Sequence, residues 1–180
     1  MVKIHSVIPG ELEEGLEKIL ESVPEMKQSS IYQYHLYKKK ITSAEDPFVD
    51  MDCLDVSQDI PIGLQENLNT FEPVEAEKLL IEGLAKLYPK HDIRISGRNI
   101  YPPGGHLGWH TNSNHPGKRI YITHVEESDK SFFRYIQDGR EITSYDKKGW
   151  NMREFEVDDN PLWHCVYTDI ERLSIGFRLT

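Results

Sequence analysis

The chain has 180 residues, a length typical of one domain, and we expect a single domain over residues 1–180. Its 30 acidic and 21 basic residues give a net charge of −9. This balance argues against a broad surface for nucleic acids or anionic membranes, because phosphate groups are bound by clustered lysines and arginines.

The cysteines and the apolar segments indicate the compartment. Cys53 and Cys165 are the only cysteines and lie far apart, so the sequence predicts no disulfide framework and suits a reducing environment. The N-terminus lacks the apolar run of a signal peptide. No stretch approaches the ~18 apolar residues of a membrane span. We therefore expect a soluble, cytoplasmic protein.

The first half of the chain predicts two supporting helices. Residues 2–8 alternate in polarity and favour a short strand. Residues 10–23 are expected to form a helix that Pro24 ends, and residues 73–88 a second helix that Pro73 begins. The apolar residues of both helices recur at helical spacing: Leu12, Leu16, Ile19, Leu20 and Val23 in the first, and Ala76, Leu80, Leu84 and Leu87 in the second.

Between these helices the sequence predicts one strand and a long connection. Residues 31–38 are rich in tyrosine and favour a strand. Residues 44–72 are irregular, with a further strand at 48–54 as one interpretation. Their five aspartates lack the glycine and terminal glutamate of a calcium loop. A connection of this length is often a lid or a binding loop, so we interpret residues 1–91 as support and lid.

After residue 92 the pattern changes to short strands separated by turns. The expected strands are 92–101, 118–125, 131–137, 140–145, 152–157, 161–168 and 171–179. A tight hairpin is expected at Asp138-Gly139 and another turn at Lys148-Gly149. Such spacing is typical of a sandwich or barrel. The expected fold is therefore mainly β, of the α+β class, with its core over 92–180.

One stretch, Y-P-P-G-G-H-L-G-W-H-T-N-S-N-H at residues 101–115, concentrates glycine and histidine. The prolines and glycines after Tyr101 are expected to end a strand and begin a loop. In an extended segment, His110 and Asn112 lie on the same face because successive side chains alternate. A glycine-rich surface loop with incidental histidines is the alternative.

The last two predicted strands each have two distinct faces. In 161–168, His164 shares a face with Leu162 and Val166. In 171–179, one face is apolar, and the other carries Arg172, Ser174, Gly176 and Arg178. This polar face either meets solvent or lines a barrel, where arginines bind a carboxylate and the glycine leaves room for it.

The spacing of these residues favours a metal site. His110 and His164 are 54 positions apart (164 − 110), and Arg172 follows His164 by eight (172 − 164). Two histidines and an oxygen ligand two residues after the first make half of an octahedral shell, whose open half can bind a chelating co-substrate and oxygen. An arginine one strand later can bind the far carboxylate of that chelator.

In order and spacing, His110-Thr111-Asn112, His164 and Arg172-Leu173-Ser174 resemble the H-x-D/E, H and R-x-S pattern of Fe(II)/2-oxoglutarate-dependent dioxygenases. The resemblance covers residues 92–180. It implies a double-stranded β-helix, or jelly-roll, core with the two helices against one sheet. It also implies Fe(II) bound by His110, Asn112 and His164, and 2-oxoglutarate held by Arg172 and Ser174. The implied activity is hydroxylation of a C–H bond with O2.

A second, local resemblance is to AlkB-type enzymes, which carry N-x-Y-x-x-G before the first histidine and R-x-x-x-x-x-R on the last strand. The first motif matches residues 99–104, and the second matches residues 172–178. This resemblance implies that Asn99, Tyr101, Arg172 and Arg178 contact 2-oxoglutarate. It concerns the co-substrate only and does not imply a nucleic-acid substrate.

One residue departs from the family pattern, because position 112 is Asn where the family has an acidic ligand. Three explanations remain open. Asn112 binds the metal through its amide oxygen, another group such as Asn114, His115 or a lid carboxylate completes the shell, or the site is inactive. In the last case the chain is a degenerate jelly-roll module that binds a carboxylate or sugar without chemistry.

Four residues are candidates for substrate contact, each with a structural alternative. Trp109 could form a wall of the substrate pocket or pack in the core. Arg119 could reach the substrate or form a cross-strand salt bridge. Arg134 and Tyr135 lie where family members place substrate-side residues, although aromatic residues on strands are usually core. The expected substrate is a small molecule, an amino-acid side chain or a sugar, and a nucleic acid is not expected.

Overall fold

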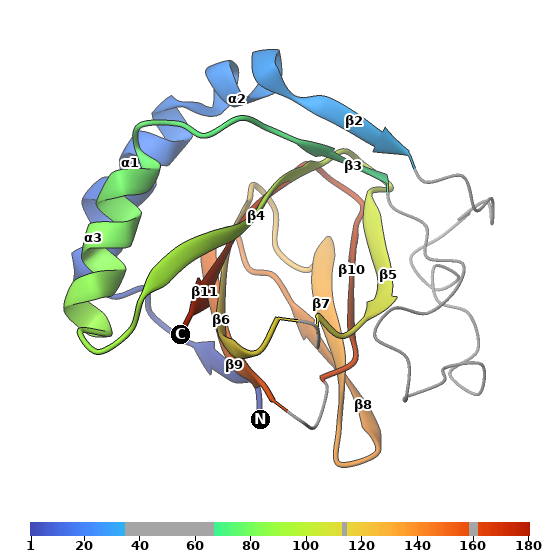
Figure 1. Ribbon diagram of the computed structural model, residues 1–180. Helices are drawn as coiled ribbons and strands as arrows, with labels where there is room; N and C mark the ends of the chain where they lie inside the picture. Colours follow the sequence, from blue (N-terminus) through green and yellow to red (C-terminus); the bar gives the residue numbers. More distant parts are fainter. Residues whose placement is uncertain (35–66, 113–114, 159–161) are drawn as a thin grey trace.

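The computed structural model describes residues 1–34, 67–112, 115–158 and 162–180. Within them, two antiparallel sheets face one another (Figure 1). The larger sheet has the order β1 (Lys3–His5), β9 (Gly149–Val157), β6 (Gly117–Val125), β11 (Arg172–Leu179), β4 (Ile93–Tyr101), β3 (Asn67–Thr70) and β2 (Ile31–Tyr34). The smaller sheet has the order β5 (His106–His110), β10 (His164–Thr168), β7 (Ser131–Gln137) and β8 (Arg140–Tyr145).

The chain crosses repeatedly between the two sheets after residue 92. β4, β6, β9 and β11 belong to the larger sheet, whereas β5, β7, β8 and β10 belong to the smaller one. This alternation winds the chain into a double-stranded β-helix, so the expected jelly-roll core is confirmed. The hairpin between β7 and β8 turns at Asp138-Gly139, where both residues have positive φ.

The helical part differs from the expectation at both ends. The first expected helix is a 3-10 turn at Gly10–Leu12 followed by α1 (Glu13–Glu21). Pro24 does not end a helix. It lies in the first turn of a further helix, α2 (Val23–Ser29), where its missing N–H is not needed. The other expected helix, α3 (Glu77–Leu87), begins four residues after Pro73.

The helices cover the outer face of the larger sheet, and Figure 1 shows α1 and α3 side by side there. Leu80 and Leu84 of α3 are fully buried in one apolar cluster with Ile122, Ile175 and Phe177 of the sheet. The apolar face of β11 is therefore directed towards the helices. Its polar face, with Arg172 and Ser174 buried, lines the space between the sheets, and of its residues only Arg178 is partly exposed.

Two strands were missed in the sequence. β3 lies at the end of the stretch expected to be irregular, and β5 lies in the stretch expected to be a loop. The prolines and glycines of residues 102–105 do form a turn between β4 and β5, with Gly104 at φ 76°.

The expected lid and the strand interpretation at 48–54 lie outside the described residues. No helix of the described part is both long and apolar enough to span a membrane.

Candidate functional site

The two histidines predicted as ligands are brought together by the smaller sheet. His110 ends β5, His164 begins β10, and the two residues are Cα partners in the antiparallel pair. Their ring centroids are 4.1 Å apart. Each Nδ1 lies 2.8 Å from a backbone carbonyl oxygen, that of Gly108 for His110 and that of Leu162 for His164. Both rings therefore donate through Nδ1–H and keep the Nε2 lone pair for another partner.

The protonation state of this pair follows from its burial. Burial lowers the pKa of His110 to about 4, although the hydrogen bond to Gly108 opposes the shift. Burial lowers the pKa of His164 well below its ordinary value, and the neighbouring His110 lowers it further. Both imidazoles are therefore neutral at pH 7, which is the form that binds a metal.

Asn112 lies beside the histidine pair. Its φ of 57° is in the left-handed region, which asparagine tolerates better than most residues. Its Nδ2 is 3.1 Å from the hydroxyl of Tyr121 and 3.3 Å from Nε2 of His164. Burial raises the pKa of Tyr121 to about 12, so this phenol stays protonated. No cluster of three histidine, cysteine or acidic side chains that could hold a metal occurs in the described residues.

The histidine pair opens onto a cavity of about 120 Å³ between the sheets. This volume has room for several water molecules, since one needs roughly 10–15 Å³ by this measure. One end of the cavity is formed by His110, His164 and Asn112, and Arg172 belongs to its lining as well. The remaining lining residues are Ser96, Gly97, Asn99, Tyr101, Leu107, Tyr121, Val166, Ser174 and Gly176.

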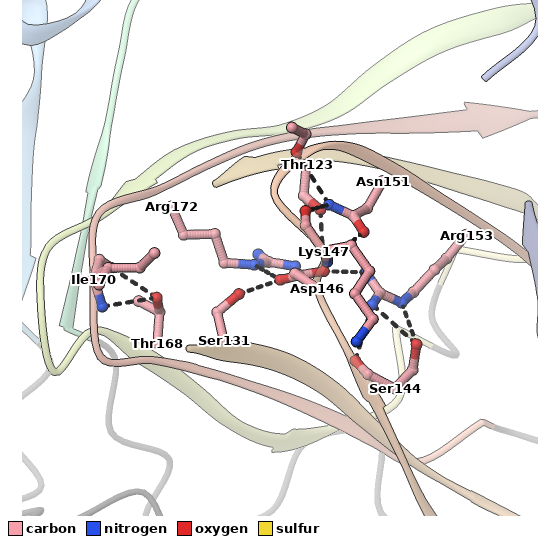
Figure 2. Close-up of polar contacts among 11 residues, drawn as sticks. Thr123, Ser131, Ser144, Asp146, Lys147, Asn151, Arg153, Thr168, Ile170 and Arg172 are labelled. Atoms are coloured by element: carbon pink, nitrogen blue, oxygen red, sulfur yellow. Dashed lines mark hydrogen bonds and ion pairs between the residues drawn. The ribbon is translucent and has the colours of Figure 1, made fainter. Parts of the chain in front are cut away.

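Arg172 is held by an acid that the sequence did not predict. Figure 2 shows the carboxylate of Asp146 between the guanidinium groups of Arg172 and Arg153. Nε of Arg172 is 2.9 Å from Oδ2 of Asp146, and Nη1 of Arg153 is 2.5 Å from Oδ1. Ser131 also donates a hydrogen bond to this carboxylate, and Thr123 does so at 3.3 Å.

These contacts form a buried ion cluster with two positive charges and one negative charge. Asp146, Arg153 and Arg172 are each at most 1% exposed. Burial alone would raise the pKa of Asp146, but the charges of Arg172 and Arg153 outweigh it and hold that pKa well below the usual range. The carboxylate is therefore ionised, and the cluster has one excess positive charge at the cavity.

The residues predicted to contact 2-oxoglutarate divide into two groups. Asn99, Tyr101, Arg172 and Ser174 all line the cavity. They come from two paired strands, with Arg172 opposite Tyr101 and Ser174 opposite Asn99. Arg178, by contrast, does not line the cavity and lies at the far end of β11.

The predicted substrate residues are dispersed. Trp109 is buried with Trp163 and Cys165 in a cluster away from the cavity, so it packs in the core and forms no wall there. Arg134 bonds to Thr143 at 2.9 Å and lies opposite Cys165, on the same outer face. Neither of these two residues, for which a structural role was the alternative, lines the cavity.

Two other predicted substrate residues face the space between the sheets. Tyr135 is the Cα partner of His164 and is buried in the inner apolar cluster with Phe133 and Phe155. Arg119 does not line the cavity. It is buried two residues before Tyr121, which does.

The sequence reasoning missed Asp146, Arg153 and Tyr121 as parts of the site. Arg153 alternates with Phe155 and Val157 along β9, so an arginine in line with two apolar residues was an available signal. Tyr121 likewise alternates with Arg119 and Thr123. Asp146 had no such signal, because it directly follows β8 and precedes two lysines and a glycine, as an ordinary turn residue would.

Comparisons with known proteins identify the fold. No protein-family model matches the chain, and no curated protein matches its sequence. Among solved structures, an oxidoreductase of the 2OG-Fe(II) oxygenase family from Burkholderia pseudomallei has a TM-score of 0.55 at 10% identity, covering 98% of this chain and 93% of its own.

Two prolyl hydroxylases are similar in the same way. That of Trichoplax adhaerens, solved with a hypoxia-inducible-factor peptide fragment, has a TM-score of 0.54 at 13% identity and coverage of 99% and 82%. That of Pseudomonas putida has a TM-score of 0.52 at 14% identity and coverage of 99% and 90%. The chain is thus a double-stranded β-helix protein. In particular, its fold is that of solved 2-oxoglutarate and Fe(II) oxygenases, as the sequence resemblance indicated.

Proposed function

We propose that the protein is an Fe(II)- and 2-oxoglutarate-dependent dioxygenase that hydroxylates a small molecule, an amino-acid side chain or a sugar. One observation carries this proposal: a single cavity is lined by two neutral histidines with an adjacent amide and by a buried arginine with excess positive charge. The likeness in fold to solved 2OG-Fe(II) oxygenases supports the same function.

The histidine end of the cavity suits an iron ion, except that its three side chains carry no negative charge. His110 and His164 present neutral Nε2 atoms, and imidazole is a ligand that iron accepts. Asn112 offers an amide oxygen where a carboxylate would bring a full negative charge. We therefore assign the three side chains as the ligands that would hold Fe(II), with a lower affinity than a site with an acidic third ligand.

Tyr121 is suited to orient the amide of Asn112. The two ends of an amide differ chemically, and a half-turn about the terminal side-chain bond exchanges nitrogen and oxygen. The neutral phenol of Tyr121 can accept from Nδ2, as observed, or donate to Oδ1 after such a turn. The same hydroxyl can therefore hold the Asn112 amide in either orientation. In one, Nδ2 is the partner of His164, and in the other, the amide is turned for use of its oxygen as a metal ligand.

The arginine end suits the far carboxylate of 2-oxoglutarate. Arg172 brings its charge to the cavity, and Ser174 contributes a hydroxyl. The ring of Tyr101 lies under the guanidinium, with its centroid 5.4 Å from Cζ of Arg172. An arginine binds a carboxylate through parallel N–H groups, and burial strengthens that bond. A bound Fe(II) would supply the O2 chemistry that oxidises a C–H bond as 2-oxoglutarate is converted to succinate and CO2, and the residues of the chain would position the reactants and exclude water.

The substrate class follows only in part from the comparisons. The Trichoplax prolyl hydroxylase was solved with a peptide fragment, so an amino-acid side chain within a peptide stays among the candidates for this chain. The net charge of −9 argues against a nucleic acid.

Anaerobic addition of Fe(II) and 2-oxoglutarate tests the proposal. The wild-type protein is expected to develop a visible charge-transfer band that needs both components. His164→Ala removes a ligand and should abolish the band. His124→Ala is the matched control, because His124 packs against Trp150 on the outer face of the larger sheet and should leave the band intact.

If neither the wild type nor Asn112→Asp binds Fe(II) in a calorimetric titration, the chain is not an enzyme of this class. The non-catalytic jelly-roll module would then be the better description.

A further inference from the structure

Two inward-facing arginines lie beyond the cavity, apart from Arg172; Arg119 is buried and Arg178 is partly exposed. Arg119 of β6 and Arg178 of β11 are Cα partners in the larger sheet. They form the next row of inward-facing side chains after Tyr121 and Gly176, which line the cavity. Arg119 is only 2% exposed. Arg172 and Arg178 are six residues apart on one strand, about 20 Å at 3.3 Å per residue, so the pair is distinct from the Arg172 cluster.

The described residues leave this pair without a counter-charge. Nη1 of Arg119 and Nε of Arg178 are buried and have no hydrogen-bond partner there. The bond that Arg119 does make, from Nη2, goes to the neutral backbone carbonyl of His115. No ion pair is recorded for either arginine within the described residues, whereas Arg94, the other Cα partner of Arg178, is paired with Asp92 at 2.7 Å.

This arrangement is unfavourable in the absence of an anion. Like charges directly opposite on neighbouring strands destabilise a sheet. A buried donor without a partner costs roughly 1–3 kcal/mol, and more when it is charged. Burial lowers the pKa of Arg119, and the charge of Arg178 lowers it further. An oxyanion between the two guanidinium groups would supply the missing acceptors and neutralise the repulsion.

The pair is also close enough to influence the histidine end of the cavity. Arg119 and Tyr121 share a face of β6, and Tyr121 bonds to Asn112. The charge of Arg119 contributes to the lowered pKa of His164. Because His110, Asn112 and His164 carry no negative charge at pH 7, none of these side chains neutralises Arg119, and the charge of Arg119 favours an anionic group of the substrate.

We propose that Arg119 and Arg178 form a second oxyanion subsite, which binds a carboxylate or phosphate group of the substrate. The assignment of this subsite to a substrate rests on the proposed function, whereas anion binding by the two arginines can be tested independently of that function. It names the substrate class as an acidic small molecule or an acidic side chain. It also reassigns Arg178, which the AlkB-like resemblance placed against 2-oxoglutarate.

The first test follows the arginine side chains directly by NMR. The Nε–H signals of Arg119 and Arg178 are assigned with Arg119→Lys and Arg178→Lys, and the metal-free wild-type protein is titrated with sulfate and, separately, with acetate. Both signals are expected to shift with one common dissociation constant. A stronger response to sulfate would indicate a phosphate-like group, and a stronger response to acetate a carboxylate. If neither anion moves the two signals, the proposal is wrong.

Variants separate this subsite from the co-substrate site. Arg119→Met and Arg178→Met are each expected to weaken anion binding at least tenfold, measured on the signal of the remaining arginine, because a charge-assisted contact is lost. Arg94→Met is the matched control, since Arg94 is 77% exposed and already paired with Asp92. It should leave the titration unchanged. Equal losses in all three variants would show a diffuse charge effect and overturn the subsite.

A parallel titration with 2-oxoglutarate distinguishes the two proposals. If Arg119→Met weakens 2-oxoglutarate binding as much as Arg172→Met does, the pair is a co-substrate site and the substrate assignment is wrong. If neither the wild type nor any variant binds 2-oxoglutarate, but sulfate or acetate shifts the signals of both arginines, the proposed function is wrong and the subsite is supported.

Thermal unfolding gives an independent measurement. In anion-free buffer, Arg119→Met is expected to raise the Tm by roughly 2–4 °C, the shift that a gain of about 1 kcal/mol gives in a domain of this size. Sulfate should raise the Tm of the wild type and not that of the variant. A variant that is less stable than the wild type in anion-free buffer would contradict the uncompensated charge.

Discussion

Nε of Arg172 donates to the carboxylate of Asp146 at 2.9 Å in a position where neither residue is more than 1% exposed. The arginine assigned to 2-oxoglutarate is therefore already held by an ion pair. This pair is not neutral as a unit, because Arg153 approaches the other oxygen of the same carboxylate at 2.5 Å. Asp146 thus fixes the direction of Arg172, and Arg153 leaves a net positive charge for an incoming carboxylate.

The first prediction concerns the carboxylate that joins the two arginines. Asp146→Asn leaves two buried guanidinium charges opposed by no acid in the cluster, so the free energy of unfolding should fall by about 3–5 kcal/mol. Urea denaturation measures this change. Asp129→Asn is the control, because Asp129 is an exposed partner of Lys147 at 2.7 Å and its loss should change stability by less than about 1 kcal/mol. Equal effects of the two substitutions would contradict the role of Asp146.

A second prediction separates the ion cluster from the cavity. Arg172→Met and Arg153→Met remove the same charge from the same carboxylate, but only Arg172 lines the cavity. Arg172→Met should weaken 2-oxoglutarate binding by at least tenfold more than Arg153→Met does, because it also removes a direct charge-assisted bond. Calorimetric titration in the presence of Mn(II) measures both affinities. The assignment of Arg172 fails if the two variants bind equally well.

The sequence predicted the residues that line the cavity better than the residues that hold those side chains in place. Alternation along β11 put Arg172 on the face opposite the apolar one, because side chains of a strand alternate. It left open whether that face meets solvent or lines the barrel, and the spacing from His110 and His164 favoured the barrel. The helix end predicted at Pro24 was wrong, because proline fits the first turn of a helix as well as the end of one. Asp146 and Arg153 were not foreseen, because their pairing depends on how β8, β9 and β11 meet across the barrel. Local pattern has no information about such a long-range contact.

The third prediction concerns the missing acidic ligand. Asn112→Asp supplies the negative charge that the metal set lacks, and aspartate tolerates the observed φ of 57° nearly as well as asparagine does. Fe(II) affinity should rise at least tenfold, about 1.4 kcal/mol, in anaerobic titration. Asn112→Ala is the contrasting variant, since alanine offers no ligand and is strained at positive φ. If Asn112→Asp and wild type bind iron equally, residue 112 is not a ligand.

The fourth prediction concerns the glycine that keeps the cavity open. A Cβ at Gly176 would lie 3.1 Å from Oγ of Ser96 and 3.1 Å from Cε1 of Tyr121. Both contacts are tighter than ordinary packing, so Gly176→Ala should displace the Tyr121 ring and with it the partner of Asn112. We expect a loss of about 1–3 kcal/mol in stability and weaker Fe(II) binding. Gly139→Ala meets no atom within 4 Å and should destabilise only through its φ of 70°, without any change in iron affinity.

The last prediction is a pH dependence that arises from His110. Burial lowers its pKa to about 4 in the folded protein, whereas the ordinary value of about 6.5 applies in the unfolded chain. As the pH falls from about 6.5 to about 4, the unfolded state takes up a proton that the folded state does not. The shift of His110 therefore destabilises the folded state over this window by roughly 3 kcal/mol, and this stability is regained as the pH rises.

Urea denaturation of the chelator-treated protein between pH 4 and pH 7.5 measures this slope. His110→Gln lacks the titrating ring, so its stability should depend less steeply on pH in that window, although the loss of packing lowers its stability at every pH. His115→Gln is the control, because this histidine is exposed after β5 and its recorded hydrogen bonds, with Asn112 and Arg119, are made by its backbone. Parallel pH profiles for wild type and His110→Gln would mean that His110 is already accessible to protons in the folded state.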